Sequence, residues 1–100
     1  MIKKVKIGIK DYSVEIDNAL SGRGSNGSID LNSRSIKILP NEIKDERSIV
    51  LFHELWHGVF SDAGRCGDDD YGMDEELVDF LALKTLQLFR DNPDLIEYLK

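Results

Sequence analysis

The stretch "ERSIVLFHELWHGVF", residues 46–60, marks the point where the chain changes from strand-like to helix-like periodicity. It contains no proline, and Gly58 is its single glycine. Its apolar residues, among them Leu51, Leu55 and Val59, cover most of the circumference of a helix, a pattern typical of a buried helix. We therefore expect a buried helix from about Glu46 to Phe60 at the centre of the fold.

The residues before this helix predict a small sheet. Short runs alternate apolar and polar residues, as strands with one buried face do. These runs carry Val5, Ile7 and Ile9; Tyr12, Val14 and Ile16; Ile29 and Leu31; and Ile36 and Ile38. Lys10-Asp11 is the expected hairpin turn, residues 21–27 are a polar, glycine-rich loop, and Asn32–Arg34 separates the last two runs. Pro40 ends the fourth run, since proline cannot donate to a ladder.

The residues after the first helix predict two more helices. Asn41 or Asp45 is expected to cap the first helix, and an acidic, glycine-rich loop, "SDAGRCGDDDYG", follows it. A second helix is expected from about Asp74 to Arg90. Asn92 as cap and Pro93 at the first helical position predict a short last helix. The chain is thus expected to be one α+β domain, residues 1–100, with a small antiparallel or mixed sheet over 1–40 and a helical part over 41–100.

Charge and cysteine content exclude several classes of function. The formal net charge is −6, and the segment Asp62–Asp79 alone contributes −7, with Arg65 as its one basic residue. Nucleic acid is therefore not expected as a ligand, because phosphate binding needs a basic face. A lone cysteine, Cys66, forms no intrachain disulfide. No stretch predicts a membrane span or an export signal, so we expect a cytoplasmic protein that does not bind membranes.

The motif "HELWH", residues 53–57, contains both histidines of the chain. Residues four apart lie on the same face of a helix, so His53 and His57 can bind a single zinc ion. Glu54 points one step round the helix, where it can act as general base on a water at that ion. The alternative is that both histidines are satisfied by protein groups and only stabilise packing. We favour the metal site, because burying three polar groups on an apolar helix is costly.

A catalytic zinc site needs a third protein ligand, and a third histidine is absent. Glu75 and Asp79 lie four apart on the second helix, on a face that the small Ala82 continues. We expect Glu75 to be the third ligand, and Asp79 to accept a hydrogen bond from a ligand histidine, such as His53. Glu76 is the alternative carboxylate, and Cys66 is a less favoured ligand.

These motifs, in this order, resemble those of a known family. "HELWH", a spacer of seventeen residues and "EELVD" resemble the zincin peptidases with a glutamate ligand. The closer likeness is to the small phage and prophage proteins of the ImmA/IrrE-like metallopeptidase family. It covers roughly residues 27–99 and includes "GSIDLNSRSIKIL", "ERSIVLFHELWH", "EELVDFLA" and "LFRDNPDLIEYL".

The resemblance implies a minimal zincin fold and a phage-derived zinc endopeptidase in a bacterial host. His53, His57 and Glu75 match the metal ligands, and Glu54 matches the catalytic acid/base. The substrate would be a segment of an intracellular regulatory protein, added as an extended strand to the sheet edge. Unlike longer members, this chain is expected to have no extra sensor or DNA-binding domain. It also has no third histidine to stabilise the oxyanion, a role open to Tyr71 or Arg65.

Two rival functions stay open at this point. The zinc site could serve a catalytically inactive module that binds a host or phage regulator, or the chain could be a plain α+β domain without metal. A calcium site in "GDDDYGMDEE", residues 67–76, is disfavoured, because the ligand spacing of a calcium loop is missing. The sequence leaves the substrate and the oligomeric state open.

Overall fold

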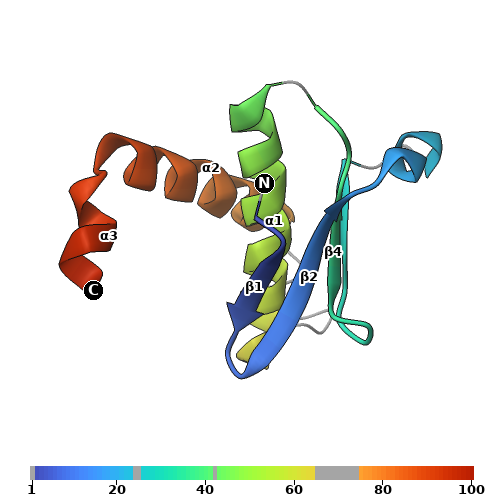
Figure 1. Ribbon diagram of the computed structural model, residues 1–100, viewed down its shortest axis with the longest axis horizontal. Helices are drawn as coiled ribbons and strands as arrows, with labels where there is room; N and C mark the ends of the chain where they lie inside the picture. Colours follow the sequence, from blue (N-terminus) through green and yellow to red (C-terminus); the bar gives the residue numbers. More distant parts are fainter. Residues whose placement is uncertain (1, 24–25, 42, 65–74) are drawn as a thin grey trace.

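The computed structural model describes residues 2–23, 26–41, 43–64 and 75–100 (Figure 1). Its order of elements confirms the predicted α+β layout. The elements are β1 (Lys4–Ile7), β2 (Lys10–Ile16), the 3-10 helix η1 (Asn18–Arg23), β3 (Gly27–Asp30), β4 (Ser35–Ile38), α1 (Lys44–Asp62), α2 (Glu75–Asp91) and α3 (Asp94–Leu99). None of the described helices combines the length and the apolar character needed to cross a bilayer.

The four strands form one mixed sheet in the order β1-β2-β4-β3. β1 and β2 form an antiparallel hairpin, as do β3 and β4, and the two hairpins join through parallel pairing of β2 with β4. The chain crosses from β2 through η1 to β3 before β4 returns beside β2. This crossover occupies part of the loop predicted over residues 21–27, and it leaves β3 at one edge of the sheet.

The first hairpin turns two residues earlier than predicted. Ile7 pairs with Lys10, so the turn consists of Gly8 and Ile9, whereas Lys10 and Asp11 already belong to β2. Gly8 has φ +62°, a conformation that costs glycine little and that two-residue hairpins require at their first central position. Ile9 is consequently 90% exposed instead of forming part of the core.

The core lies between the sheet and α1. The inward face of the strands buries Ile7, Tyr12, Val14, Ile36 and Ile38, and α1 packs Val50, Leu51 and Leu55 against it. At Gly58 the helix approaches the sheet so closely that an added Cβ atom would lie 2.6 Å from Ile7 Cδ1. Glycine at this position therefore sets how closely α1 can approach the sheet.

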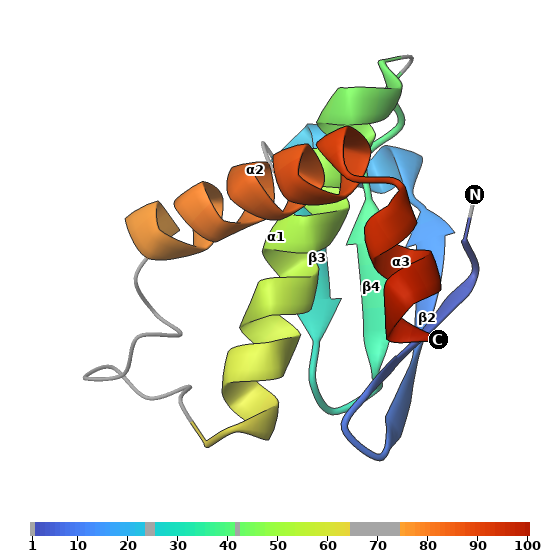
Figure 2. The same ribbon diagram turned by 90° about the vertical axis from the view of Figure 1, so that its left-hand side faces the viewer.

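The helix α1 is the middle of three layers. In Figure 1 the sheet lies on one side of α1 and the α2–α3 pair on the other, and Figure 2 shows α2 crossing α1 steeply. Contact on two sides explains why α1 is apolar round most of its circumference. The prediction of a buried helix was nevertheless too strong: among its described residues only Glu54 and Gly58 are buried, and Val59 is 42% exposed.

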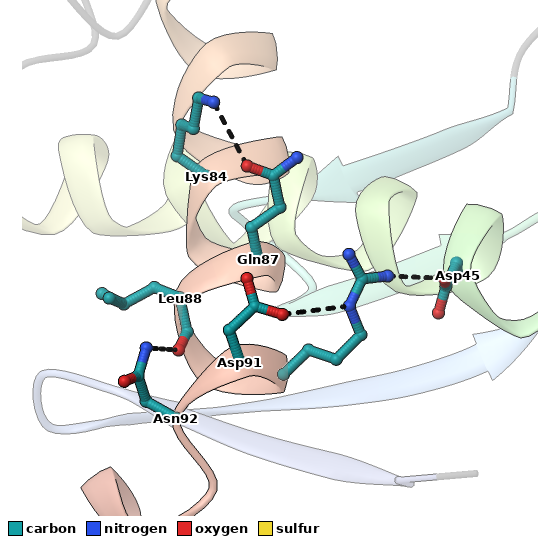
Figure 3. Close-up of polar contacts among 7 residues, drawn as sticks. Asp45, Lys84, Gln87, Leu88, Asp91 and Asn92 are labelled. Atoms are coloured by element: carbon teal, nitrogen blue, oxygen red, sulfur yellow. Dashed lines mark hydrogen bonds and ion pairs between the residues drawn. The ribbon is translucent and has the colours of Figure 1, made fainter.

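Side chains from both helices join α2 to α1. Val78 and Ala82 are fully buried on the face that α2 turns to α1. Trp56 Nε1 donates to Thr85 Oγ1 over 3.0 Å. At the far end of α2, Arg90 Nη1 lies 2.7 Å from the carboxylate of Asp45, a contact that Figure 3 shows as a dashed line to Asp45.

The predicted helix caps were wrong. The N-cap position of α1 is Ile43, not Asn41 or Asp45, and no described side chain caps it. Asn41 instead accepts a hydrogen bond from the Ile43 amide, a local turn that asparagine favours. The Asn92 side chain does not cap α3 but donates to the Leu88 carbonyl at the end of α2, 2.9 Å away (Figure 3). An asparagine side chain can bond to several nearby backbone groups, so the sequence alone did not show which group Asn41 and Asn92 would choose.

Candidate metal centre

Both histidines of the motif meet the first residue of α2. His53 and His57 lie one turn apart on α1, and their Nε2 atoms are 3.2 Å apart. The Glu75 carboxylate reaches both rings, with one oxygen 3.0 Å from His53 Nε2 and the other 3.0 Å from His57 Nε2. The two rings and the Glu75 carboxylate therefore come together between the two helices, and one ligand atom from each residue lies within 4.8 Å of the others.

This spacing suits a tetrahedral zinc ion. Bonds of about 2.0–2.1 Å to nitrogen or oxygen place neighbouring donor atoms about 3.3 Å apart. The two imidazole nitrogens are 3.2 Å apart, close to that value, and each lies 3.0 Å from one of the two Glu75 oxygens. The donor set of two imidazoles and one carboxylate is also the one found in catalytic zinc sites. His53, His57 and Glu75 thus fit the metal, and their role as ligands stays a prediction.

Asp79 fixes the orientation of His53. Its carboxylate lies 2.8 Å from His53 Nδ1, so an N–H on Nδ1 can donate to it and leave Nε2 facing the Glu75 carboxylate. Either a metal ion or protons on the rings would join these three groups, and the donor set is one that zinc accepts.

An Asp79→Asn variant is expected to bind zinc about 10–100-fold more weakly than the wild type, because the partner of a ligand histidine holds its tautomer and ring orientation. Competition with a chromophoric zinc chelator measures this affinity. Asp91→Asn, at the other end of α2, is the matched control and should leave the affinity unchanged. Equal affinities in all three proteins would show that Asp79 is only a surface carboxylate.

Glu54 is the one charged residue in the described core. It is 6% exposed, and burial raises its pKa above the ordinary value, while the two neighbouring imidazoles act in the opposite direction. Its carboxylate lies close to Gly27, where an added Cβ atom would be 3.1 Å from Glu54 Oε2 and 2.6 Å from Val50 Cγ1. Because Gly27 has no side chain, the space beside Glu54 stays open at this edge of the sheet.

An open cleft of about 500 Å³ joins these groups. Its walls come from α1, the first turns of α2 and the start of β3, and they include Glu54, His53, His57, Glu75 and Asp79. The side chains of the two histidines are 20% and 18% exposed, whereas that of Glu75 is 64% exposed. The centre is therefore reached from solvent on the side of α2.

The structure separates the predicted residues into three groups. His53, Glu54, His57, Glu75 and Asp79 all line the cleft, whereas the alternative ligand Glu76 lies outside the cluster. Arg65, Cys66 and Tyr71 lie outside the described residues, so the oxyanion and cysteine predictions stay untested.

Sequence reasoning missed Asn26 and Gly27, which also line the cleft. Both fell in the segment predicted to be a loop. An isolated glycine at the start of a strand often marks a close approach of another group, and this was the available signal.

Comparison with known proteins adds nothing to this description. No family model matches the chain, and neither the curated proteins nor the solved structures contain a significant match.

Proposed function

We propose that this protein is a zinc-dependent endopeptidase of the ImmA/IrrE-like kind, acting in a bacterial cytoplasm on a phage or host regulatory protein. The observation that carries the proposal is the shared cleft. A buried carboxylate, Glu54, opens into the same space as a three-residue donor set that fits zinc. A merely structural zinc site has no need of a buried carboxylate beside it.

The proposed roles follow from the positions of the side chains. His53, His57 and Glu75 would hold the ion, and Asp79 would keep His53 in the required tautomer. Bound there, zinc would polarise the substrate carbonyl and lower the pKa of a water to roughly 7. Glu54 would accept a proton from the attacking water and return it to the leaving amine. Burial raises the pKa of the Glu54 carboxyl, so it holds a proton more readily than a free carboxyl, which suits a group that takes up a proton and then releases it.

The proposed substrate is an extended segment of protein. β3 is an edge strand that pairs with β4 on one side, and its first residue, Gly27, lines the cleft. A peptide added alongside β3 would pass next to Glu54, with its main chain held by strand-type hydrogen bonds.

Peptide cleavage tests this proposal. Protein purified without a histidine tag and loaded with zinc is incubated with a mixture of randomised peptides, and mass spectrometry identifies the products. We expect internal cleavage that a zinc chelator abolishes and added zinc restores. Zinc binding without cleavage of peptides or of candidate regulators would contradict the peptidase and favour an inactive zinc-binding interaction module.

A further inference from the structure

The short helix α3 presents an apolar surface that the other described elements do not cover. Four of its six residues are apolar and none of them is buried: Leu95, Ile96, Tyr98 and Leu99. Figure 1 shows α3 set apart from α1 and from the sheet, at the end of α2, and α3 makes little contact with any other described element. Because burying exposed apolar surface is favourable, α3 is suited to contact another molecule.

An open groove runs between the last turn of α2 and α3. It has a volume of about 570 Å³, and its apolar lining consists of Leu88, Pro93, Leu95 and Tyr98. The Asn92 side chain, which donates to the Leu88 carbonyl, ties the turn between the two helices to α2 (Figure 3). Ligand sites in proteins commonly measure about 300–1,000 Å³. The groove is therefore large enough to receive an apolar side chain.

The rim of this groove is acidic. The carboxylates of Asp91 and Asp94 line it, and none of its described lining residues is basic. The nearest guanidinium, that of Arg90, lies 3.9 Å from the Asp91 carboxylate through Nε and 2.7 Å from the Asp45 carboxylate through Nη1 (Figure 3). One positive charge is thus shared between two carboxylates, and the groove keeps a net negative charge.

The charge of the groove decides which kind of partner suits it. Nucleic acids and anionic membranes present phosphate groups, which an acidic rim repels. A protein segment with an apolar side chain next to lysine or arginine complements both the apolar lining and the acidic rim. The formal net charge of −6 on the whole chain also favours encounter with a basic partner.

The groove is remote from the candidate metal centre. Leu88 lies near the end of α2 and Glu75 at its start, which separates them by about 20 Å along the helix axis at about 1.5 Å per residue. A segment bound in the groove would therefore leave the metal cleft open. Its binding does not depend on whether the metal centre hydrolyses peptides.

We propose that the groove between α2 and α3 is a docking surface for a basic segment of a partner protein. An aliphatic or aromatic side chain of that segment fills the groove beside Leu88 and Tyr98, and a neighbouring lysine or arginine pairs with Asp94. This role is additional to the proposed peptidase function and stands independently of it.

Titration with a designed peptide tests the docking surface. The probe is a ten-residue peptide with two leucines at its centre, two lysines on each side of them and alanines elsewhere. We expect saturable shifts of the methyl NMR signals of Leu88 and Leu95, while Val50 in the metal cleft stays unchanged. Replacing the lysines by glutamates, or the leucines by serines, should raise Kd at least about tenfold. Unshifted Leu88 and Leu95 signals, or equal Kd values for the three peptides, would overturn the proposal.

Truncation of Tyr98 tests the apolar part of the groove. Tyr98 is 79% exposed, so Tyr98→Ala removes contact area for the ligand and leaves the core intact. We expect Kd for the lysine peptide to rise about tenfold, because aromatic side chains often dominate an interface. Leu99→Ala is the matched control: Leu99 is 70% exposed but does not line the groove, and Kd should stay unchanged. Equal Kd values for both variants would contradict the assignment.

Reversal of the charge at Asp94 tests the acidic rim. Asp94→Lys should weaken binding of the lysine peptide and strengthen binding of the glutamate peptide, each by about tenfold. Glu76→Lys changes the net charge equally at the other end of α2 and should alter neither affinity. The same response from both variants would show that the net charge of the chain, and not the groove, attracts the peptide.

A second copy of the chain is the alternative occupant of the groove. Sedimentation at the protein concentration of the NMR titration distinguishes it from a separate partner. We expect the wild type to be monomeric. A dimer that Tyr98→Ala dissociates and Leu99→Ala does not would overturn the proposal and assign the groove to self-association.

Discussion

A Glu54→Gln variant is expected to bind zinc as the wild type does and to lose peptide hydrolysis by about 10²–10⁴-fold, the usual contribution of a general base. The glutamine side chain has the same shape and fits the space beside Gly27, but its amide cannot accept and return a proton. The Glu54 carboxylate is buried and is not among the clustered donor atoms. Zinc content by elemental analysis and kcat/KM on one cleaved peptide give the two readouts.

Glu76→Gln is the matched control for this variant. Glu76 is an exposed carboxylate in the first turn of α2 and lies outside the donor cluster. The control should retain both zinc and full hydrolysis. Hydrolysis by Glu54→Gln at the wild-type rate would show that Glu54 is not the base. Loss of zinc from Glu54→Gln would instead assign Glu54 to metal binding.

Removing the third ligand is expected to have the largest effect on metal binding. Wild-type protein should carry about one zinc per chain, and Glu75→Ala should lose the ion during dialysis, because two imidazoles alone do not complete a zinc site. Hydrolysis should disappear together with the metal. Elemental analysis of protein purified without a histidine tag measures the zinc content.

Glu76→Ala separates this effect from a general loss of negative charge. Glu75 and Glu76 are neighbours in the first turn of α2, but only the Glu75 carboxylate reaches His53 and His57. The Glu76→Ala protein should keep its zinc. Loss from both variants would point to the net charge of the first turn, and a wild type that binds no zinc even after reconstitution would leave the two histidines as packing residues.

Much of the fold follows from local patterns in the sequence. The alternation around Tyr12 and Val14 and the helical run from residue 46 to residue 60 both give correct elements, because burial of one face dictates a period. The hairpin turn was misplaced because period-two alternation continues through Gly8-Ile9, and only the left-handed backbone of Gly8 marks the bend. The parallel pairing of β2 with β4 depends on a crossover that leaves no local pattern.

The residues of the candidate site that lie on the two helices could be predicted from the sequence. The i, i+4 spacing places His53 beside His57, and the same spacing places Asp79 behind Glu75. To choose Glu75 over Glu76 as the ligand, one must know which face of α2 packs against α1. The small residue Ala82 indicates that face, and Glu75 lies on it. Gly27 comes to the cleft from a distant strand, and its lack of a side chain was the only local signal that another group approaches it closely.

The packing of α2 makes its two ends unequal. Its last turn is tied to α1 by Arg90 and Asp45, and Trp56 and Thr85 join the helices further along, whereas Glu75 at the first turn reaches α1 through the two histidines. An ion bound by Glu75 and the two histidines would add a second attachment of α2 to α1, at the first turn of α2. Metal-binding free energy in such an arrangement adds to the free energy of folding. Zinc would therefore control how firmly the second helix closes on the first, as well as the chemistry between them.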